Sequence, residues 1–337
     1  MNGYVLELVG ALLVILAASE LFTNALEHLG EKIHISEGVT GSLFAAVGTA
    51  LPETVIPLLA LLAGTANLRV NEEIGVGSIL GAPLMLSTLS TSLMAFAAFG
   101  RRGARSRLRP ERTGLVRDLN FFLFAFALAA VAMFVPQGAR YLRGALSIVL
   151  LLTYFIYILL TLRASGRLVE GGYGTEARNS LYLARAGLPA YLFTILLQLG
   201  AGLGLLVTGA KGFIYGVEGV SHLLGISALL LSLLIIPIAT ELPEKVNSIL
   251  WIRREKDTLA FGNITGAMVF QGTMLPAIGI MLTPWEPRIE VVGGVLVTLL
   301  AAGWLRFNAR STGLAVRALL LNGALYGAYL VVMLVWR

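Results

Sequence analysis

Residues 49–54 read TALPET and residues 240–245 read TELPEK, and this repeated stretch decides the fold. The similarity continues on both sides of the motif. Upstream, with an offset of 191, Glu27 aligns with Glu218 and Ile35-Ser36 with Ile226-Ser227. Downstream, with an offset of 185, GSILGAPLMLST (77–88) aligns with GNITGAMVFQGT (262–273) at both glycines, the alanine and the threonine. A match that extends this far indicates an internal repeat.

The composition is that of a membrane protein. Of the 337 residues, 57% are hydrophobic and 13% are charged, and the mean hydropathy is +0.84, whereas soluble domains have about 25% charged residues. Uncharged blocks at 121–135, 144–162, 223–240 and 291–305 are long enough to cross most of a hydrocarbon core of about 30 Å. Because these blocks are continuous rather than alternating, we expect an all-α integral membrane protein.

The blocks and their breaks predict ten transmembrane helices, at 4–26, 37–64, 74–99, 119–136, 141–163, 188–210, 223–251, 258–283, 289–306 and 313–335. Five helices separate the two copies of the repeat, and this odd number gives the halves opposite orientations in the membrane. The predicted organisation is a first half at 1–163, a cytoplasmic linker at 164–187 and an inverted second half at 188–337. The repeated segments cover about 37–99 and about 223–283.

The basic residues predict the orientation. With ten spans, 18 of the 25 lysines and arginines fall on one side and six on the other, while Lys245 lies within a helix. The positive-inside rule places the richer side in the cytoplasm, so we expect both termini outside an inner (plasma) membrane. The N-terminus lacks a basic n-region and reads as the first span. We therefore attribute the net charge of +6 to loops at the membrane surface. The expected partner is membrane lipid and not nucleic acid.

Two glutamates within the predicted spans are the main functional candidates. Glu53 and Glu244 each follow a proline, which breaks the helical hydrogen-bond ladder and frees carbonyl oxygens nearby. An ionisable group at this depth costs about 2.5–3.5 kcal/mol and usually serves a function. Carboxylates, carbonyls and the hydroxyls of Thr49 and Thr240 are ligands for hard cations such as calcium and sodium. The alternative is that each glutamate is protonated or paired with lysine in a structural role.

The second copy carries extra charge. Glu241 replaces Ala50 of the first copy, and Lys245, a possible internal counter-ion, replaces Thr54. The sequence leaves open whether Lys245 pairs with Glu241 or with Glu244. Neutral oxygens that would complete a cation site, or alternatively form ordinary interhelical hydrogen bonds, belong to Ser78, Asn263 and Gln271.

The motifs GTALPE (48–53) and ATELPE (239–244) resemble the GTSLPE signature of the α-repeats in the sodium/calcium exchanger family of the cation/calcium antiporter superfamily. GSILGAP (77–83) and GNITGAM (262–268) resemble the GNxxGSN element of that family. The resemblance implies a five-plus-five helix fold with four central helices around the ions, and it makes Glu53, Glu244, Thr49 and Thr240 cation ligands. The chain departs from the family pattern at several positions, namely Ala50, Glu241, Ala82, Ala267, Leu86 and Gln271. These departures leave the cargo and the coupling ion open among calcium, sodium and protons.

The leading hypothesis is a secondary cation antiporter that works by alternating access. Its substrates would be small inorganic cations, and it would need no cofactor and catalyse no chemical reaction. The competing hypotheses are a membrane enzyme for lipid or prenyl substrates and a non-transporting sensor or scaffold on an exchanger fold. The absence of cysteine excludes thiolate chemistry, and the absence of a phosphate-binding loop argues against ATP-driven pumping. The sequence does not indicate an oligomeric state.

Overall fold

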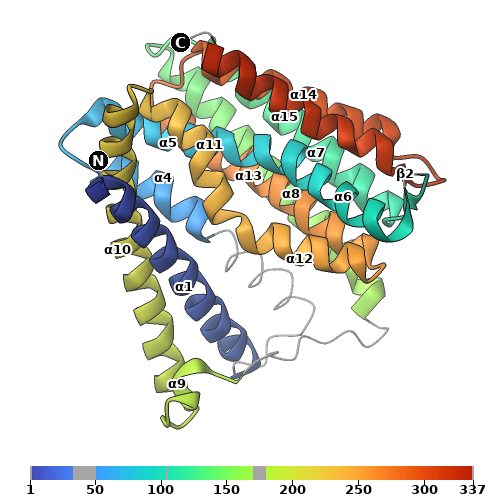
Figure 1. Cartoon of the computed structure of the whole chain (residues 1–337), viewed down its shortest axis with the longest axis horizontal. Coiled ribbons are helices and arrows are strands. Elements are labelled where there is room, and N and C mark those ends of the chain that lie inside the picture. Colours follow the sequence, from blue (N-terminus) through green and yellow to red (C-terminus); the bar gives the residue numbers. More distant parts are fainter. Residues whose placement is uncertain (1, 33–50, 104, 170–179, 336–337) are drawn as a thin grey trace. The chain divides into compact units, whose positions relative to one another are not determined.

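The computed structural model describes residues 2–32, 51–103, 105–169 and 180–335, which form two compact units (Figure 1). The first unit comprises Met1–Asn71 and Ile158–Ser227. Its helices are α1 (Asn2–Lys32), α4 (Leu51–Ala63), α9 (Tyr182–Arg185) and α10 (Leu192–Leu224), with the first residues of α5 and the last part of α8.

The second unit comprises Glu72–Tyr157 and Ala228–Arg337. Its elements are most of α5 (Leu68–Met85), the π-helix η2 (Leu86–Ser90), α6 (Thr91–Arg102), β1 (Arg107–Leu108), α7 (Arg112–Ala132), most of α8 (Arg140–Val169), α11 (Ala228–Thr240), α12 (Leu242–Arg253), α13 (Asp257–Leu282), α14 (Ile289–Asn308), β2 (Leu314–Ala315) and α15 (Val316–Val335). Apart from the two-residue strands, which pair antiparallel, the regular secondary structure of the described chain is helical. The predicted all-α class is correct in this respect.

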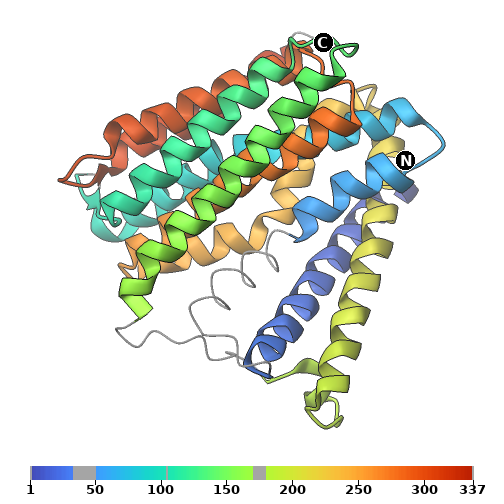
Figure 2. The ribbon, with the colours of Figure 1, turned by 180° about the vertical axis from the view of Figure 1, so that it is seen from behind.

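In the first unit, α1 and α10 lie side by side along their lengths (Figure 2). Three glycines of α10, spaced by seven residues, face three residues of α1 that are also spaced by seven. A Cβ atom would lie 3.0 Å from Phe22 at Gly202, 2.9 Å from Ile15 at Gly209 and 2.9 Å from Leu8 at Gly216. The order is reversed between the helices, so the pair is antiparallel. Small residues in membrane helices allow this close backbone approach.

In the second unit, the glycines of the first GSILGAP element bring α5 onto α11. A Cβ atom at Gly77 would lie 2.6 Å from the carbonyl oxygen of Leu229, and one at Gly81 would lie 2.3 Å from that of Leu233. Pro237 has no N–H to donate to the Leu233 carbonyl, and α5 packs against this helix surface. The glycines of the first element therefore allow close helix packing.

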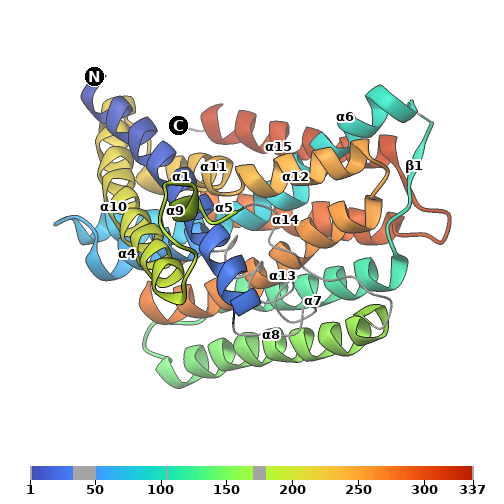
Figure 3. The same ribbon diagram turned by 90° about the horizontal axis from the view of Figure 1, so that it is seen from below.

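The other helices of the second unit pack against one another, and hydrogen bonds from Arg143 join α8 to the end of α13. The helix α7 runs along α13, and α6 contacts both α12 and α15 (Figure 3). The buried guanidinium of Arg143 donates hydrogen bonds to the carbonyls of Ile280, Thr283 and Pro284, where α13 ends. These bonds satisfy carbonyl groups that have no partner within the helix.

Eight helices of the described chain are long and apolar enough to cross a membrane: Gly3–Leu29, Leu68–Arg102, Arg112–Ala132, Arg140–Thr161, Leu192–Leu224, Asp257–Leu282, Ile289–Asn308 and Val316–Met333. Two shorter apolar helices, Glu53–Ala63 and Ala228–Ile238, adjoin the prolyl-glutamate motifs. The predicted end of one helix is wrong. The helix expected at 188–210 continues as α10 to Leu224, so Lys211 lies within a helix and not in a loop. Beyond Lys211, Gly216 packs against α1.

Candidate cation-binding site

The first copy of the motif is described from Leu51 onwards. Glu53 stands in the first turn of α4, directly after Pro52, and its residue is only 5% exposed. Thr49, the predicted hydroxyl ligand of this copy, lies outside the described residues. Glu53 belongs to the first unit, whereas the other predicted ligands that are described belong to the second.

The second copy contains the predicted helix break. The helix α11 ends at Thr240, Glu241 has φ −92° and ψ 9°, and α12 begins at Leu242. Pro243 at the start of α12 cannot donate to a preceding carbonyl, so the ladder is interrupted at this point. Glu244 therefore lies in the first turn of a new helix, and it is 5% exposed.

The structure pairs Lys245 with Glu241, which the sequence left undecided. The Nζ atom of Lys245 lies 3.6 Å from Oε2 of Glu241, one helical turn away. It also donates to the Pro237 carbonyl at 2.9 Å and lies 2.8 Å from Sδ of Met85. Glu241 is fully buried, and neither of its carboxylate oxygens has a hydrogen-bond partner among the described residues. The pair is thus a buried ion pair rather than a solvated one.

Two further predicted ligands, Gln271 and Asn263, lie close to Glu241 and Glu244. Electrostatic contacts link the Glu241 carboxyl to Glu244, Lys245 and Gln271. Gln271 on α13 is 2% exposed, and its Oε1 has no hydrogen-bond partner within the described chain. Asn263, also on α13, donates from Nδ2 to the backbone carbonyl of Glu244 at 3.3 Å. The second copy therefore offers carboxylate, amide and carbonyl oxygens, a donor set suited to hard cations.

Two predicted hydroxyl ligands bond within their own helices. The Oγ1 of Thr240 donates to the carbonyl of Ile236 at 3.2 Å, and the Oγ of Ser78 donates to that of Ile74 at 2.6 Å. Both residues are buried, and each hydroxyl keeps lone pairs that can accept. In the part of the chain that the structure describes, Ser78 is not joined to the acids by a hydrogen bond.

Sequence reasoning missed two buried acids of the described chain, Asp118 and Asp257. Asp118 on α7 is 4% exposed, accepts a hydrogen bond from Oγ1 of Thr265 at 2.7 Å and lies 3.3 Å from the Arg117 guanidinium. The predicted span began at residue 119, so this acid was placed in a loop, whereas α7 begins at Arg112. Thr265 is part of the GNITGAM element, so Asp118 anchors the second glycine element to α7.

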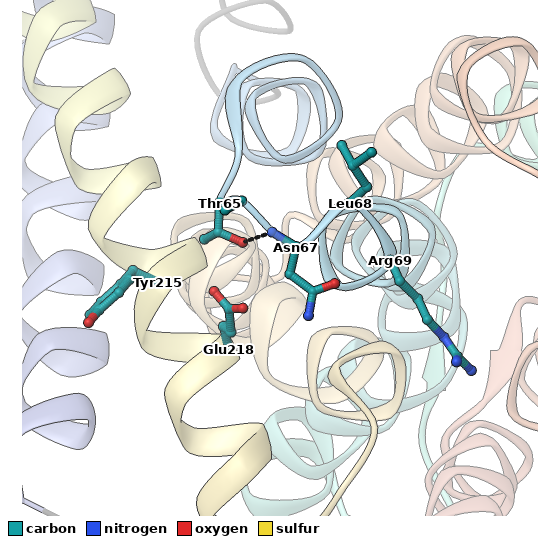
Figure 4. Close-up of a pocket in the computed structure, with 7 residues that line it drawn as sticks. Thr65, Asn67, Leu68, Arg69, Tyr215 and Glu218 are labelled. Atoms are coloured by element: carbon teal, nitrogen blue, oxygen red, sulfur yellow. Dashed lines mark hydrogen bonds between the residues drawn. The ribbon is translucent and has the colours of Figure 1, made fainter.

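A separate hollow of about 750 Å³ opens in the first unit (Figure 4). The loop between α4 and α5 lines one side, where the amide of Asn67 donates to Oγ1 of Thr65. Glu218 of α10 points towards this loop, and Tyr215 lies nearby. The hollow contains no predicted cation ligand, so it is a surface feature apart from the motif.

The helices and their buried acids define a multi-pass α-helical membrane protein of the transporter type. The model of the family described as "Sodium/calcium exchanger protein" matches residues 3–163 and 194–335, and the chain belongs to this family.

Two relatives and one solved structure illustrate the similarity. The inner membrane protein YrbG of Escherichia coli is 25% identical over 284 residues, which cover 83% of this chain and 80% of YrbG. The putative antiporter CaxA of Alkalimonas amylolytica is 24% identical over 302 residues, which cover 88% and 85%. The crystal structure of the H+/Ca2+ exchanger CAX shares the fold with a TM-score of 0.71 and 19% identity, over 98% of this chain and 82% of that one.

Proposed function

We propose that this protein is a secondary antiporter that exchanges calcium or a related cation against sodium or protons. The observation that carries the proposal is the burial of a carboxylate directly after a proline in each copy of the repeat, at Glu53 and Glu244. Membership of the sodium/calcium exchanger family and the names of the relatives CaxA and CAX support it.

In this proposal the chain forms ten spans in two inverted halves, and the two glutamates alternately face each side of the membrane. Thr49, Thr240, Glu241, Asn263 and Gln271 contribute further oxygens, and Ser78 contributes from α5. Inverted repeats that hold the substrate near the membrane midplane are common among secondary transporters. The oxygen-rich donor set supports a hard cation as the cargo.

The decisive test is cation flux in proteoliposomes under imposed calcium, sodium, potassium and proton gradients. Glu53→Gln and Glu244→Gln each remove a buried negative charge while retaining the size of the side chain, and we expect both to abolish exchange. Glu286→Gln is the matched control, because Glu286 is exposed, and it should leave exchange unchanged. If both buried variants behave like wild type under every gradient, the transporter proposal fails and a sensor or scaffold becomes the better hypothesis.

The sensor hypothesis has one specific observation in its favour. The Lys245 ammonium already lies beside Glu241, so part of the second copy is neutralised without a bound ion. A sensor would bind a cation, measured as a cation-dependent rise in Tm, yet show no flux. An antiporter shows both.

The proposed orientation has its own experiment. The chain has no cysteine, so a single introduced cysteine is a unique label. We expect Arg105→Cys to react only with a reagent on the cytoplasmic side and Arg140→Cys only with one on the outer side. Labelling from the opposite sides would reverse the predicted topology.

A further inference from the structure

The Lys245 ammonium is surrounded as a bound cation would be. It is enclosed within the second unit, with the residue 7% exposed. Its contacts include the carboxylate of Glu241 at 3.6 Å, the carbonyl of Pro237 at 2.9 Å and the thioether of Met85 at 2.8 Å. A carboxylate and a backbone carbonyl are the oxygen ligands that a monovalent metal cation would also use.

The acid and the base are both absent from the corresponding positions of the first copy. There, Ala50 stands in place of Glu241 and Thr54 in place of Lys245, so TALPET corresponds to TELPEK. The formal charge of each six-residue motif is the same, because the positive charge of Lys245 cancels one of the two negative charges. The i,i+4 spacing puts the pair on one face of the helix. The second copy thus has an additional anionic ligand and a covalently attached cation to match it.

We propose that Lys245 is a resident cation that occupies a monovalent-cation position formed by Glu241 and the Pro237 carbonyl. The ammonium keeps exchangeable sodium or potassium out of this position, so Lys245 sets how many cations the protein binds. The expected effect of Lys245 on transport rests on the proposed function. Its expected effect on the number of bound cations does not depend on transport. Removing the ammonium while keeping Glu241 opens the position to one additional monovalent cation.

The chain itself supplies the test variant and its control. Lys245→Thr installs the residue that the first copy has at this position and leaves Glu241 without its partner. The double variant Glu241→Ala/Lys245→Thr turns residues 240–245 into TALPET, the sequence of the first copy. The double variant removes the acid and the ammonium together, so it should have no additional cation site.

The experiment compares full-length wild type, Lys245→Thr and the double variant in detergent or lipid nanodiscs. Equilibrium binding of radioactive sodium is measured together with Tm in sodium, potassium or lithium chloride, with N-methylglucamine chloride as the reference salt. A ligand that binds only the folded state raises Tm. We expect Lys245→Thr to bind one more sodium than wild type and to gain a sodium- or potassium-dependent rise in Tm, and the double variant to lose both gains.

Two results would overturn the inference: a folded Lys245→Thr that binds no more cation than wild type, or a double variant that retains the gain. Recovery of Lys245→Thr in the folded state only when sodium or potassium is present would support it. Lys245→Gln, which keeps a side chain of similar reach without the charge, replaces Lys245→Thr if the smaller residue destabilises the helix. Flux measured with the same proteins separates the two proposals. If wild type shows no flux, only the antiporter proposal is contradicted. The comparison of cation binding still decides the role of Lys245.

Discussion

Replacing Gly81 by alanine tests the contact on which the geometry of the second repeat depends. A Cβ atom at this position would lie 2.3 Å from the carbonyl oxygen of Leu233 and 2.8 Å from Cγ of Pro237. An ordinary contact begins at 3.4 Å, so α5 and α11 must separate by roughly 1 Å, and overpacking of this kind costs about 1–3 kcal/mol. Alanine recovers about 0.5–1 kcal/mol because it is a better helix former than glycine.

The net expectation is that Gly81→Ala lowers the free energy of unfolding by about 1–2 kcal/mol, seen as a Tm about 2–4 °C lower in detergent. Gly303→Ala is the matched control, because Gly303 lies within α14 and an added Cβ would have no neighbour within 4 Å among the described residues. It should be neutral or slightly stabilising. If Gly81→Ala is as stable as Gly303→Ala, the close packing of α5 on α11 is refuted.

Three further changes test how the second unit is held together. Arg143→Ala should lower stability by about 2–4 kcal/mol, because it removes charge-assisted hydrogen bonds to buried carbonyls, and Arg143→Lys should restore part of this in denaturant unfolding. Asp257→Asn should cost about 1–3 kcal/mol, because it weakens the 2.8 Å ion pair with Arg102, and a Tm equal to that of wild type would contradict this role. Partial burial raises the pKa of Glu111, but hydrogen bonds from the Thr113 and Gly114 amides outweigh it and bring the pKa below 4.5. Glu111→Ala should therefore lower the free energy of unfolding by about 1 kcal/mol at neutral pH. Unfolding curves measured at a series of pH values should show the difference between the two proteins shrinking as the pH falls below 4.5 and through the lowered pKa of the folded state.

The sequence alone predicted the helical membrane class and the family, because both depend on local signals. Continuous apolar blocks indicate membrane helices without knowledge of their contacts. The break before Glu244 was predictable for the same reason, since Pro243 has no N–H to donate within a helix.

Features that depend on contacts with another helix were harder to predict from the sequence. The helix predicted at 188–210 was ended too early, and the packing of Gly216 against α1 lies in the part that was left out. The partner of Lys245 was undecided, because Glu241 and Glu244 precede it by four residues and by one residue. Asp118 was missed because its hydrogen-bond donor, Thr265, is far away in sequence. A heptad spacing of glycines was the one available signal for the α1–α10 contact.

The Glu241–Lys245 pair shows why the second copy can differ in chemistry from the first and still keep the same charge. Removing one partner of a buried ion pair leaves an uncompensated charge, at a cost of about 3–5 kcal/mol, whereas removing both is often neutral. Either residue alone would therefore be a costly buried charge, whereas the two together form a buried ion pair. Because their charges cancel, Glu244 supplies the net charge of its motif, as Glu53 does in the first copy. The two motifs thus keep the same formal charge although their residues differ.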